Sequence, residues 1–574
     1  MTRENDHQIT NLRRRELELR QKRITILSAD GQKALEMVLD APAPATLIQS
    51  FPDQDLYYLI HKIGPEDCVP ILSYAASSQW EYLLDMETWD QDRLDLAPMT
   101  KIFDLLFQAD PDRLIRWGIS RKTSLFEFYL SKHMEIQIRE HDELVPSDFD
   151  DYITLDDKFY FRFPEKPEDL EGDGTDASEL IEKMLNRLAD MDLSVFHGLL
   201  LETQGLLPAE TEEEEFRLKS IRLAEKGFAP AHEAVGIYQP VPPDSLRKRP
   251  GALQTFQSAL DPDITLPPQY FSQFIKGENL IVSTLKQFEA PFIYGLESEL
   301  AALINKVISA DKIKLRAAED LEKAIKKTLA YLNLGLETIL GDSLNLQTAK
   351  DCVSTYFLED IFRAGSGICL RLKNSAHAWF RQSAMNRLGL PLSFLDETFL
   401  GIIGGLLIER PMVFDVTLPH PPYRDFCRLS DIDATNAALQ QIMDIDRILG
   451  RLDIDLTSFK QGVLTYKTLF LTLWAKSRLN LSSTLEPIPA DAFSKFFAEL
   501  FTPSNNPGQT HILMEDFCEW ISGATGLDVS GLSDELTAGI KALMMELWDE
   551  YAPIPPGNLD PRFIPHFLLE KTKP

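Results

Sequence analysis

Apolar residues recur at helical spacing along most of the chain, first in a series of short units. Leu56, Leu59, Ile60 and Ile63 lie at i, i+3, i+4 and i+7 behind the residues 52–55. The same pattern begins again after Pro65, after Ser77 and after Asp110–Pro111. Proline and acidic residues are favourable in a first helical turn, so each unit predicts a short amphipathic helix. Helices this short are unstable alone, and we expect them to stack on one another.

The pattern changes to alternation near residue 155. The segments 153–155 and 159–163 are rich in β-branched and aromatic residues, and Asp156, Asp157 and Lys158 lie between them. This arrangement predicts a β-hairpin with a tight acidic turn. Helical spacing resumes at Leu180 and continues through much of the remaining chain, where strand signals are few. The predicted class is therefore mainly α, with a stacked short-helix (superhelical) N-terminal module, one small β-hairpin and a helical C-terminal half.

Proline clusters suggest where the chain divides. Residues 239–268 contain seven prolines in thirty positions, and a second cluster lies within 411–430. Proline at this density is incompatible with helix interiors and central strands. The predicted organisation is a basic helical arm at 1–30, the short-helix repeat module at 31–145, an acidic segment with hairpin and helices at 146–238, a proline-rich linker at 239–268, a helical domain at 269–410, a proline-rich loop at 411–430, and a helical domain with a proline-rich tail at 431–574.

Two resemblances follow from these segments. The run from Leu47 to Asp85, with FPDQDLYYLI and GPEDCVPILSYA, resembles the intracellular N-terminal domain of MgtE-type magnesium transporters, a cytosolic stack of short helices that takes part in magnesium-dependent gating. The regulatory pair and membrane helices of such transporters have no counterpart here, so transport is not implied. Over most of its length the chain resembles a bacterial family known only as a domain of unknown function, through QDLYYLIHKIGPED, ITLDDKFYFRF and RLAEKGFAPAHEAVGIYQP. That resemblance implies no activity, cofactor or site residue.

Charge narrows the choice of partners. The net charge of the 574 residues is −31, and residues 142–215 contribute −18 of it. Such a surface repels phosphate backbones, so nucleic acid is an improbable partner. A basic stretch near the start holds Arg13, Arg14, Arg15, Arg20, Lys22 and Arg23. This arm fits an acidic partner, a membrane surface, the acidic middle of the same chain, or simply a solvated terminal helix.

The compartment follows from the cysteines and from the apolar runs. Cys68, Cys352, Cys369, Cys427 and Cys518 are odd in number, scattered and without a Cys-x-x-Cys pair. Neither a disulfide framework nor a structural zinc site is indicated. The first thirty residues lack an apolar signal segment, and the run 399–408 is about half the length that spans a bilayer. We expect a soluble, cytoplasmic protein.

Three groups of residues have metal-ligand types. Asp169, Glu171, Asp173 and Gly174 begin like an EF-hand loop, but Leu180 stands where the bidentate glutamate belongs, so an acidic loop is expected. His133, Glu135, Glu140 and His141 are close in sequence, yet on one helix the two histidines would lie about 12 Å apart, and we expect solvated or capping roles. The pairs Asp431/Asp433, Asp444/Asp446 and Asp453/Asp455 point to different helix faces and are interpreted as helix starts and solvated faces, with a divalent-cation site between helices as the alternative. We predict no metal and no cofactor.

The sequence signals for an anion-binding site or a catalytic nucleophile are weaker than those for a metal site. Gly365, Ser366 and Gly367 lie among Arg363, Arg371 and Lys373, where a phosphate at a helix N-terminus competes with close helix packing or a helix break. No Gly-Lys-Ser/Thr follows, so this is not a P-loop. His61, His197 and His377 lie in apolar helical patterns and are expected to be packed side chains. No Gly-x-Ser-x-Gly or His-Glu-x-x-His motif occurs.

These observations favour a non-enzymatic interaction or regulatory scaffold that binds another protein through its helical repeats and acidic surface. Two alternatives stay open: a sensor of a divalent cation or small ligand, and an enzyme whose site forms only in three dimensions. Catalytic and cofactor-binding residues are unknown at this point, as are the partner and the oligomeric state.

Overall fold

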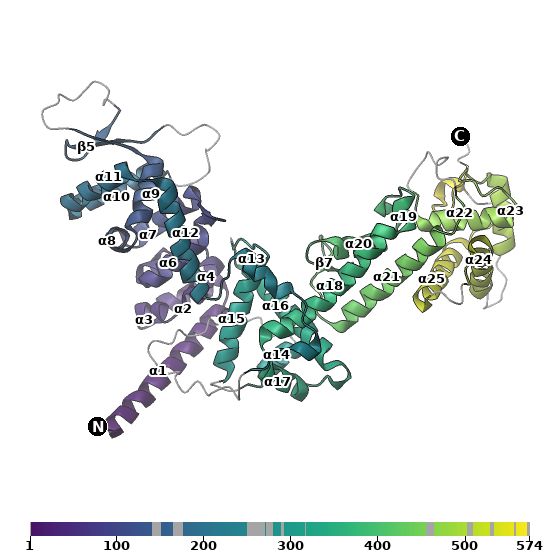
Figure 1. Cartoon of the computed structure of the whole chain (residues 1–574), viewed down its shortest axis with the longest axis horizontal. Helices are drawn as coiled ribbons and strands as arrows, with labels where there is room; N and C mark the ends of the chain where they lie inside the picture. The colour runs from purple at the N-terminus through teal and green to yellow at the C-terminus, as the bar shows by residue number, and fades with distance from the viewer. Residues whose placement is uncertain are drawn as a thin grey trace. The chain divides into compact units, whose positions relative to one another are not determined.

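The computed structural model describes residues 2–139, 151–164, 176–249, 270, 279–288, 292–315, 317–454, 464–501, 509–528, 533–555, 558 and 560–570, with side chains from residue 14 onward. These residues form a mainly α chain with small antiparallel sheets, which confirms the predicted class (Figure 1). Contacts divide the chain into two units. The first unit comprises residues 1–239, 245–332 and 342–362, and the second comprises 240–244, 333–341 and 363–574. The predicted domain boundaries stay predictions.

The first unit begins with a long helix and a column of short ones. Its elements up to residue 162 are α1 (Thr2–Ser28), α2 (Gly31–Leu39), α3 (Pro44–Gln49), α4 (Asp53–Ile63), η1 (Pro65–Cys68), α5 (Val69–Tyr74), α6 (Ser77–Glu87), β1 (Trp89–Asp90), β2 (Arg93–Leu94), α7 (Leu96–Ala109), α8 (Pro111–Arg121), α9 (Thr123–His133), β3 (Glu135–Ile138), β4 (Ile153–Thr154) and β5 (Phe159–Arg162). Helices start at Asp53, Pro65, Ser77 and Pro111, as the proline and acid signals predict. Neighbouring helices pack in pairs, α4 with α6, α5 with α7 and α7 with α8.

Aromatic side chains fill the core of this column. Trp80 is fully buried, its indole N–H donates to the carbonyl of Leu72 at 2.9 Å, and its ring meets Trp117 edge to face. The guanidinium of Arg113 covers the same ring at 4.0 Å. Indole and phenol groups carry a polar atom into the core, and here that atom finds a backbone partner.

The predicted hairpin is present and gains a third strand. β4 and β5 pair around the turn at Asp156–Lys158, where Asp157 has a φ of 59° and the Asp156 carboxylate accepts N–H bonds from Lys158 and Phe159. β3 pairs antiparallel with the other edge of β5, which gives the order β3–β5–β4. An isolated hairpin is marginal in water, and this sheet contacts α11 through β3.

The rest of the first unit is helical. Its helices are α10 (Ala177–Met191), α11 (Leu193–Gly205), α12 (Pro208–Glu225), α13 (Ala231–Ala234), η4 (Val235–Tyr238), α14 (Leu280–Leu285), α15 (Phe292–Ala310) and α17 (Leu346–Thr355), with the first parts of α16 (Ala318–Leu340) and α18 (Leu358–Gln382). α9 is the packing centre of one end, since α10, α11 and α12 all contact it.

The second unit contains the remaining parts of α16 and α18 and the C-terminal helices. These helices are α19 (Ala384–Arg387), α20 (Glu397–Leu407), α21 (Leu429–Leu449), α22 (Tyr466–Arg478), α23 (Ala490–Leu500), α24 (Gln509–Thr525) and α25 (Asp534–Tyr551). Between α20 and α21, the strands β6 (Val413–Phe414) and β7 (Tyr423–Arg424) pair antiparallel. Trp474 is the centre of its core, fully buried and edge to face with Phe496 and Phe517.

A helix that crosses a membrane needs about 20 predominantly apolar residues. Among the described residues, no helix combines the length and the apolar composition needed to cross a membrane. The apolar run 399–408 falls largely in α20, an 11-residue helix.

Candidate functional site

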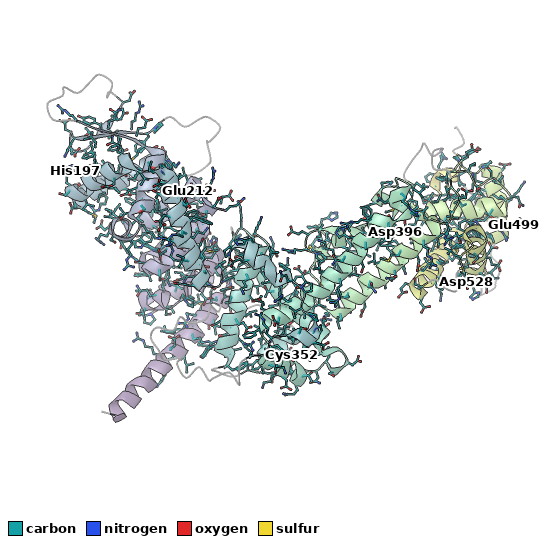
Figure 2. The ribbon with its side chains drawn as sticks, viewed as in Figure 1. His197, Glu212, Cys352, Asp396, Glu499 and Asp528 are labelled. Atoms are coloured by element: carbon teal, nitrogen blue, oxygen red, sulfur yellow. The ribbon has the colours of Figure 1, made fainter. Side chains whose placement is uncertain are left out.

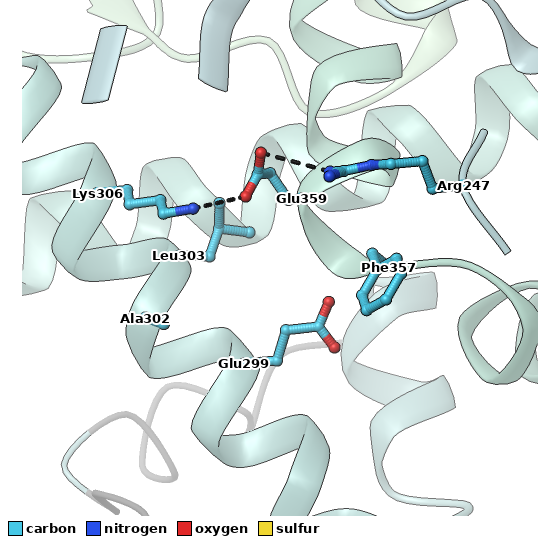
Figure 3. A pocket seen from close by; sticks show the side chains of 7 residues that line it. All are labelled: Arg247, Glu299, Ala302, Leu303, Lys306, Phe357 and Glu359. Carbon is cyan, nitrogen blue, oxygen red and sulfur yellow. Dashed lines mark hydrogen bonds and ion pairs between the residues drawn. The ribbon is translucent and has the colours of Figure 1, made fainter. Parts of the chain in front are cut away.

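A cavity of about 270 Å³ lies in the first unit, where α18 begins (Figure 3). One wall is a face of α15 that carries Glu299, Ala302, Leu303 and Lys306. The other walls are Arg247, Phe357 and Glu359. The volume is far above the 10–15 Å³, roughly, that admits one water molecule. Figure 3 shows the carboxylate of Glu359 between the side chains of Lys306 and Arg247.

Glu299 has a structural role at the cavity wall. One of its oxygens accepts the backbone N–H of Leu358, the first residue of α18, at 2.6 Å, and the other accepts Arg249 at 2.6 Å. A carboxylate at a helix N-terminus satisfies N–H groups that lack intrahelical partners. Burial raises the pKa of Glu299, against the lowering effect of Arg249. Glu299 therefore fixes the start of α18 and has both oxygens engaged.

The fully buried carboxylate of Asp360 holds the side chain of Arg247 in place. Its guanidinium donates to both oxygens of Asp360, at 2.7 and 3.0 Å, and its backbone N–H donates to the same carboxylate at 2.7 Å. Asp360 is 1% exposed, whereas the Arg247 side chain is 57% exposed. The hydrogen bond with Asp360 raises the pKa of Arg247. The arginine is thus a fixed cation with one side open to the cavity.

Glu359 joins the two cations of the cavity. Lys306 Nζ lies 2.7 Å from one of its oxygens, and Arg247 Nη2 approaches the other at 3.5 Å. The cavity therefore combines two cations, a bridging carboxylate and an apolar wall of Ala302, Leu303 and Phe357. Such a lining is suited to holding a small charged molecule.

A second feature is an acidic corner, which we define by its place in the chain, at the turn between α11 and α12 beside α9. It comprises the exposed residues Leu201, Glu202, Leu207, Glu210 and Glu213 on either side of that turn, with Glu127 of α9, whose carboxylate neighbours that of Glu202. Leu201 and Leu207 are 53% and 61% exposed. The pKa of Glu127 is raised by burial and by the neighbouring carboxylate of Glu202. Among the described residues, none of the four carboxylates has a cation within ion-pair distance. Negative charge at this corner is therefore uncompensated.

The inner face of α12 contrasts with this corner. Arg222 donates to both oxygens of Asp85 on α6 at 2.7 Å, and Lys226 pairs with Asp53 on α4 at 2.6 Å. Lys219 lies over the ring of Trp89 at 4.8 Å, and burial lowers its pKa to about 8. Figure 2 shows Glu212 on the same helix, and its carboxylate accepts the backbone N–H of Leu94 in β2. These contacts fasten α12 to the short-helix column.

The structure separates the metal-ligand candidates. His133 ends α9, and its ring lies tilted against that of Tyr129, with 4.7 Å between the ring centroids. Glu135 begins β3 and pairs with Arg162, so the two do not share a helix. Glu140, His141, and the loop of Asp169, Glu171, Asp173 and Gly174 lie outside the described residues. Within the described part of the chain, no three His, Cys, Asp or Glu side chains are grouped so that they could hold a metal ion.

The aspartate pairs do not converge. Asp431 accepts the N–H groups of Cys427 and Arg428 at the start of α21, and Asp446 accepts those of Ala384 and Met385 at the start of α19. Asp444 binds Ser533 in front of α25. Asp433 and Asp453 are exposed, and Asp455 lies outside the described residues. The described members of these pairs thus serve helix starts and solvated faces, as the sequence indicates.

The glycine pair lies inside a helix. Gly365 and Gly367 belong to the interior of α18. Phosphate binding at a helix N-terminus, the alternative considered for this segment, is therefore wrong. A Cβ on Gly367 would lie 3.0 Å from the ring of Pro240, which identifies close packing as the reason for a glycine there. Lys373 donates to the carbonyls of Ile408 and Glu409, after α20.

The histidines are packed or paired. His61 Nε2 lies 2.9 Å from Glu87, and its ring contacts Tyr57. His197 pairs with Asp156 in the hairpin turn and stacks on Phe159 (Figure 2). His377 is half-buried on α18.

Arg14, Arg20 and Arg23 of the basic arm form ion pairs. Arg14 pairs with Glu18, Arg23 with Glu16, and Arg20 with Glu297 on α15. Among the described residues, none of these cations pairs with the acidic segment 142–215. The five cysteines are free thiols.

Sequence reasoning missed the cavity residues, namely Arg247, Glu299, Lys306 and Glu359. A usable signal exists for one of them, because Glu299 interrupts the apolar stripe of α15 directly before the buried Leu300. A charge inside an apolar stripe predicts a buried partner. The partner itself, Arg249, lies within the proline-rich segment 239–268, where no helical pattern indicates it.

Fold and cavity together define a mainly helical protein of two units. The chain belongs to a family of unknown function (DUF6178), whose sequence profile matches residues 11–570. No curated protein and no solved structure matches the chain. The resemblance to a family of unknown function is thereby confirmed, while the likeness of residues 47–85 to the MgtE domain stays a prediction.

Proposed function

We propose that the protein is a non-enzymatic interaction scaffold whose first unit binds a basic, amphipathic segment of a partner protein at the acidic corner. The observation that carries this proposal is the combination of uncompensated carboxylates with two leucines that are more than half exposed. Single exposed leucines are ordinary on protein surfaces. Two at one corner, beside carboxylates that repel one another, are costly to leave uncovered.

A basic amphipathic segment matches both parts of the corner. Its apolar side chains would cover Leu201 and Leu207, and each square ångström of apolar area removed from water contributes about 25 cal/mol. Its lysines or arginines would relieve the repulsion between Glu127 and Glu202. Complementary charge also selects among partners and speeds association. The α12 contacts with Asp85 and Asp53 support this role, because they hold the corner on a fixed frame.

The test is quantitative affinity capture from native cells with the tagged full chain. The variant Glu210→Lys/Glu213→Lys reverses charge at the corner, and Leu201→Ser/Leu207→Ser removes its apolar part. The matched control is Glu519→Lys/Asp549→Lys, which makes the same change of charge at exposed positions of α24 and α25. Circular dichroism checks that each variant is folded.

We expect a stoichiometric protein partner that both corner variants lose and the control retains. Capture should also weaken as salt rises, since opposite charges are screened. A partner that the corner variants retain would refute binding at this corner. The predictions of a cation or small-ligand sensor, of an enzyme and of a cytoplasmic location stay open.

A further inference from the structure

The carboxylate of Glu359 is the one acid at the cavity that can move away without leaving a buried charge unpaired. Its side chain is 26% exposed, and both of its partners are cations at the cavity surface. Glu299 has both oxygens engaged, and Asp360 is fully buried against Arg247. Exchange of Glu359 for another anion therefore leaves the walls of the cavity intact.

Once Glu359 has moved away, Arg247 and Lys306 differ in how firmly the chain holds them. Asp360 keeps the guanidinium of Arg247 in place, so that group stays oriented. The ammonium of Lys306 donates to Glu359, and without it the ammonium would form a hydrogen bond with water or with a ligand. Hydrogen bonds between two such cations and one anion are charge-assisted, and they are among the stronger ones in proteins.

The apolar wall restricts the kind of anion. Apart from Glu299, whose oxygens are both engaged, the remainder of the cavity is lined by Ala302, Leu303 and Phe357, and an inorganic ion would leave this apolar surface without contacts. We propose that the cavity binds a small organic carboxylate with a short apolar body, and that Glu359 occupies the place of the ligand's carboxylate in the unliganded chain. This inference does not depend on the acidic corner.

Because the carboxylate of Glu359 competes for the same two cations, it lowers the affinity of the cavity for the carboxylate of a ligand. Each ligand must displace Glu359, which also gains from its place in the first turn of α18, near the positive end of the helix. Glu359→Gln keeps the size of the side chain but removes the competing charge. The variant should therefore bind the ligand more tightly than the natural chain.

Titration calorimetry on the full chain with butyrate tests the proposal. We expect Glu359→Gln to bind butyrate about tenfold more tightly than the natural chain and Lys306→Met to lose binding. The matched control Glu319→Gln makes the same change in the first turn of α16, at an exposed position, and should bind as the natural chain does. Butyramide, the neutral analogue, and inorganic phosphate should both bind at least tenfold more weakly than butyrate.

A chemical footprint of the natural chain tests the same proposal without any substitution, so it does not depend on a variant that folds. Butyrate should slow acetylation of Lys306 by acetic anhydride, read by mass spectrometry, and leave Lys101 unaffected. The proposal is overturned if butyrate gives no protection, if Glu359→Gln binds no more tightly than Glu319→Gln, or if phosphate or butyramide binds as well as butyrate.

Discussion

The contact between Arg222 and Asp85 gives a sharp test of how α12 is held. Replacement of Arg222 by methionine keeps the stem of the side chain but removes the guanidinium. Two hydrogen bonds of 2.7 Å are lost, and the carboxylate of Asp85, 6% exposed, stays buried without its cation. Breaking a fully buried ion pair from one side costs about 3–5 kcal/mol. Arg222 is 23% exposed, so water reaches one side, and we expect about 2–3 kcal/mol.

Native-state hydrogen exchange measures this loss locally, in peptides from α12 and α6. A change of about 2–3 kcal/mol corresponds to exchange that is about 30- to 150-fold faster. The control is Arg217→Met on the same helix, because Arg217 pairs with Glu214 at the surface, with 62% and 53% of the side chains exposed. An exposed pair contributes about 0.5 kcal/mol or less.

A double-mutant cycle separates the pair from the rest of the helix. In Asp85→Asn/Arg222→Met no charge is buried alone, so the double variant should be more stable than the sum of the single losses predicts, by at least about 1 kcal/mol. Exchange in Arg222→Met that is no faster than in Arg217→Met, or losses that are strictly additive, would refute this account of the ion pair.

Three further predictions concern single residues of the first unit. In Gly31→Ala the new Cβ would lie 2.5 Å from the carbonyl oxygen of Lys62, so α2 must shift, and we expect a loss of about 1–3 kcal/mol in urea unfolding despite the better helix propensity of alanine. Burial raises the pKa of Glu297 from 4.5 to about 7. The stability that the protonated side chain contributes is complete below pH 4.5 and is lost as the pH rises to 7. Over that interval the stability of Glu297→Gln relative to the natural chain should therefore increase. Burial lowers the pKa of Lys219, and NMR titration of the methylated amine should find a pKa of about 8, well below the ordinary value for lysine.

Local patterns predicted much of the short-helix column. Pro65 and Pro111 begin helices because proline lacks an N–H that would have no partner there, and the carboxylate of Asp110 accepts the N–H of Arg113. Asp53 places a carboxylate at the positive end of α4, and Ser77 begins α6. Each of these signals depends only on the next few residues. The hairpin was also predictable, because its turn and both strands lie within eleven residues, 153–163. Signals of this kind need no knowledge of the rest of the chain.

Contacts between distant segments could not be predicted in the same way. β3 contains only Ile136 and Ile138 as alternating apolar residues, and its partner β5 begins more than twenty residues later. The cavity depends on Arg247 meeting Asp360, a pair separated by 113 residues. No periodicity links such residues.

The distribution of charge also changes the meaning of the net value of −31. On the inner face of α12, Asp85 and Asp53 are neutralised by cations of the same chain, and these acids stabilise the fold. At the acidic corner, Glu127 and Glu202 repel each other, and this repulsion costs stability in the chain alone. Proteins keep such costly features where function requires them, because substitutions that relieve them are easily found. The uncompensated part of the charge, rather than its total, therefore supports the proposal that a partner binds at the acidic corner.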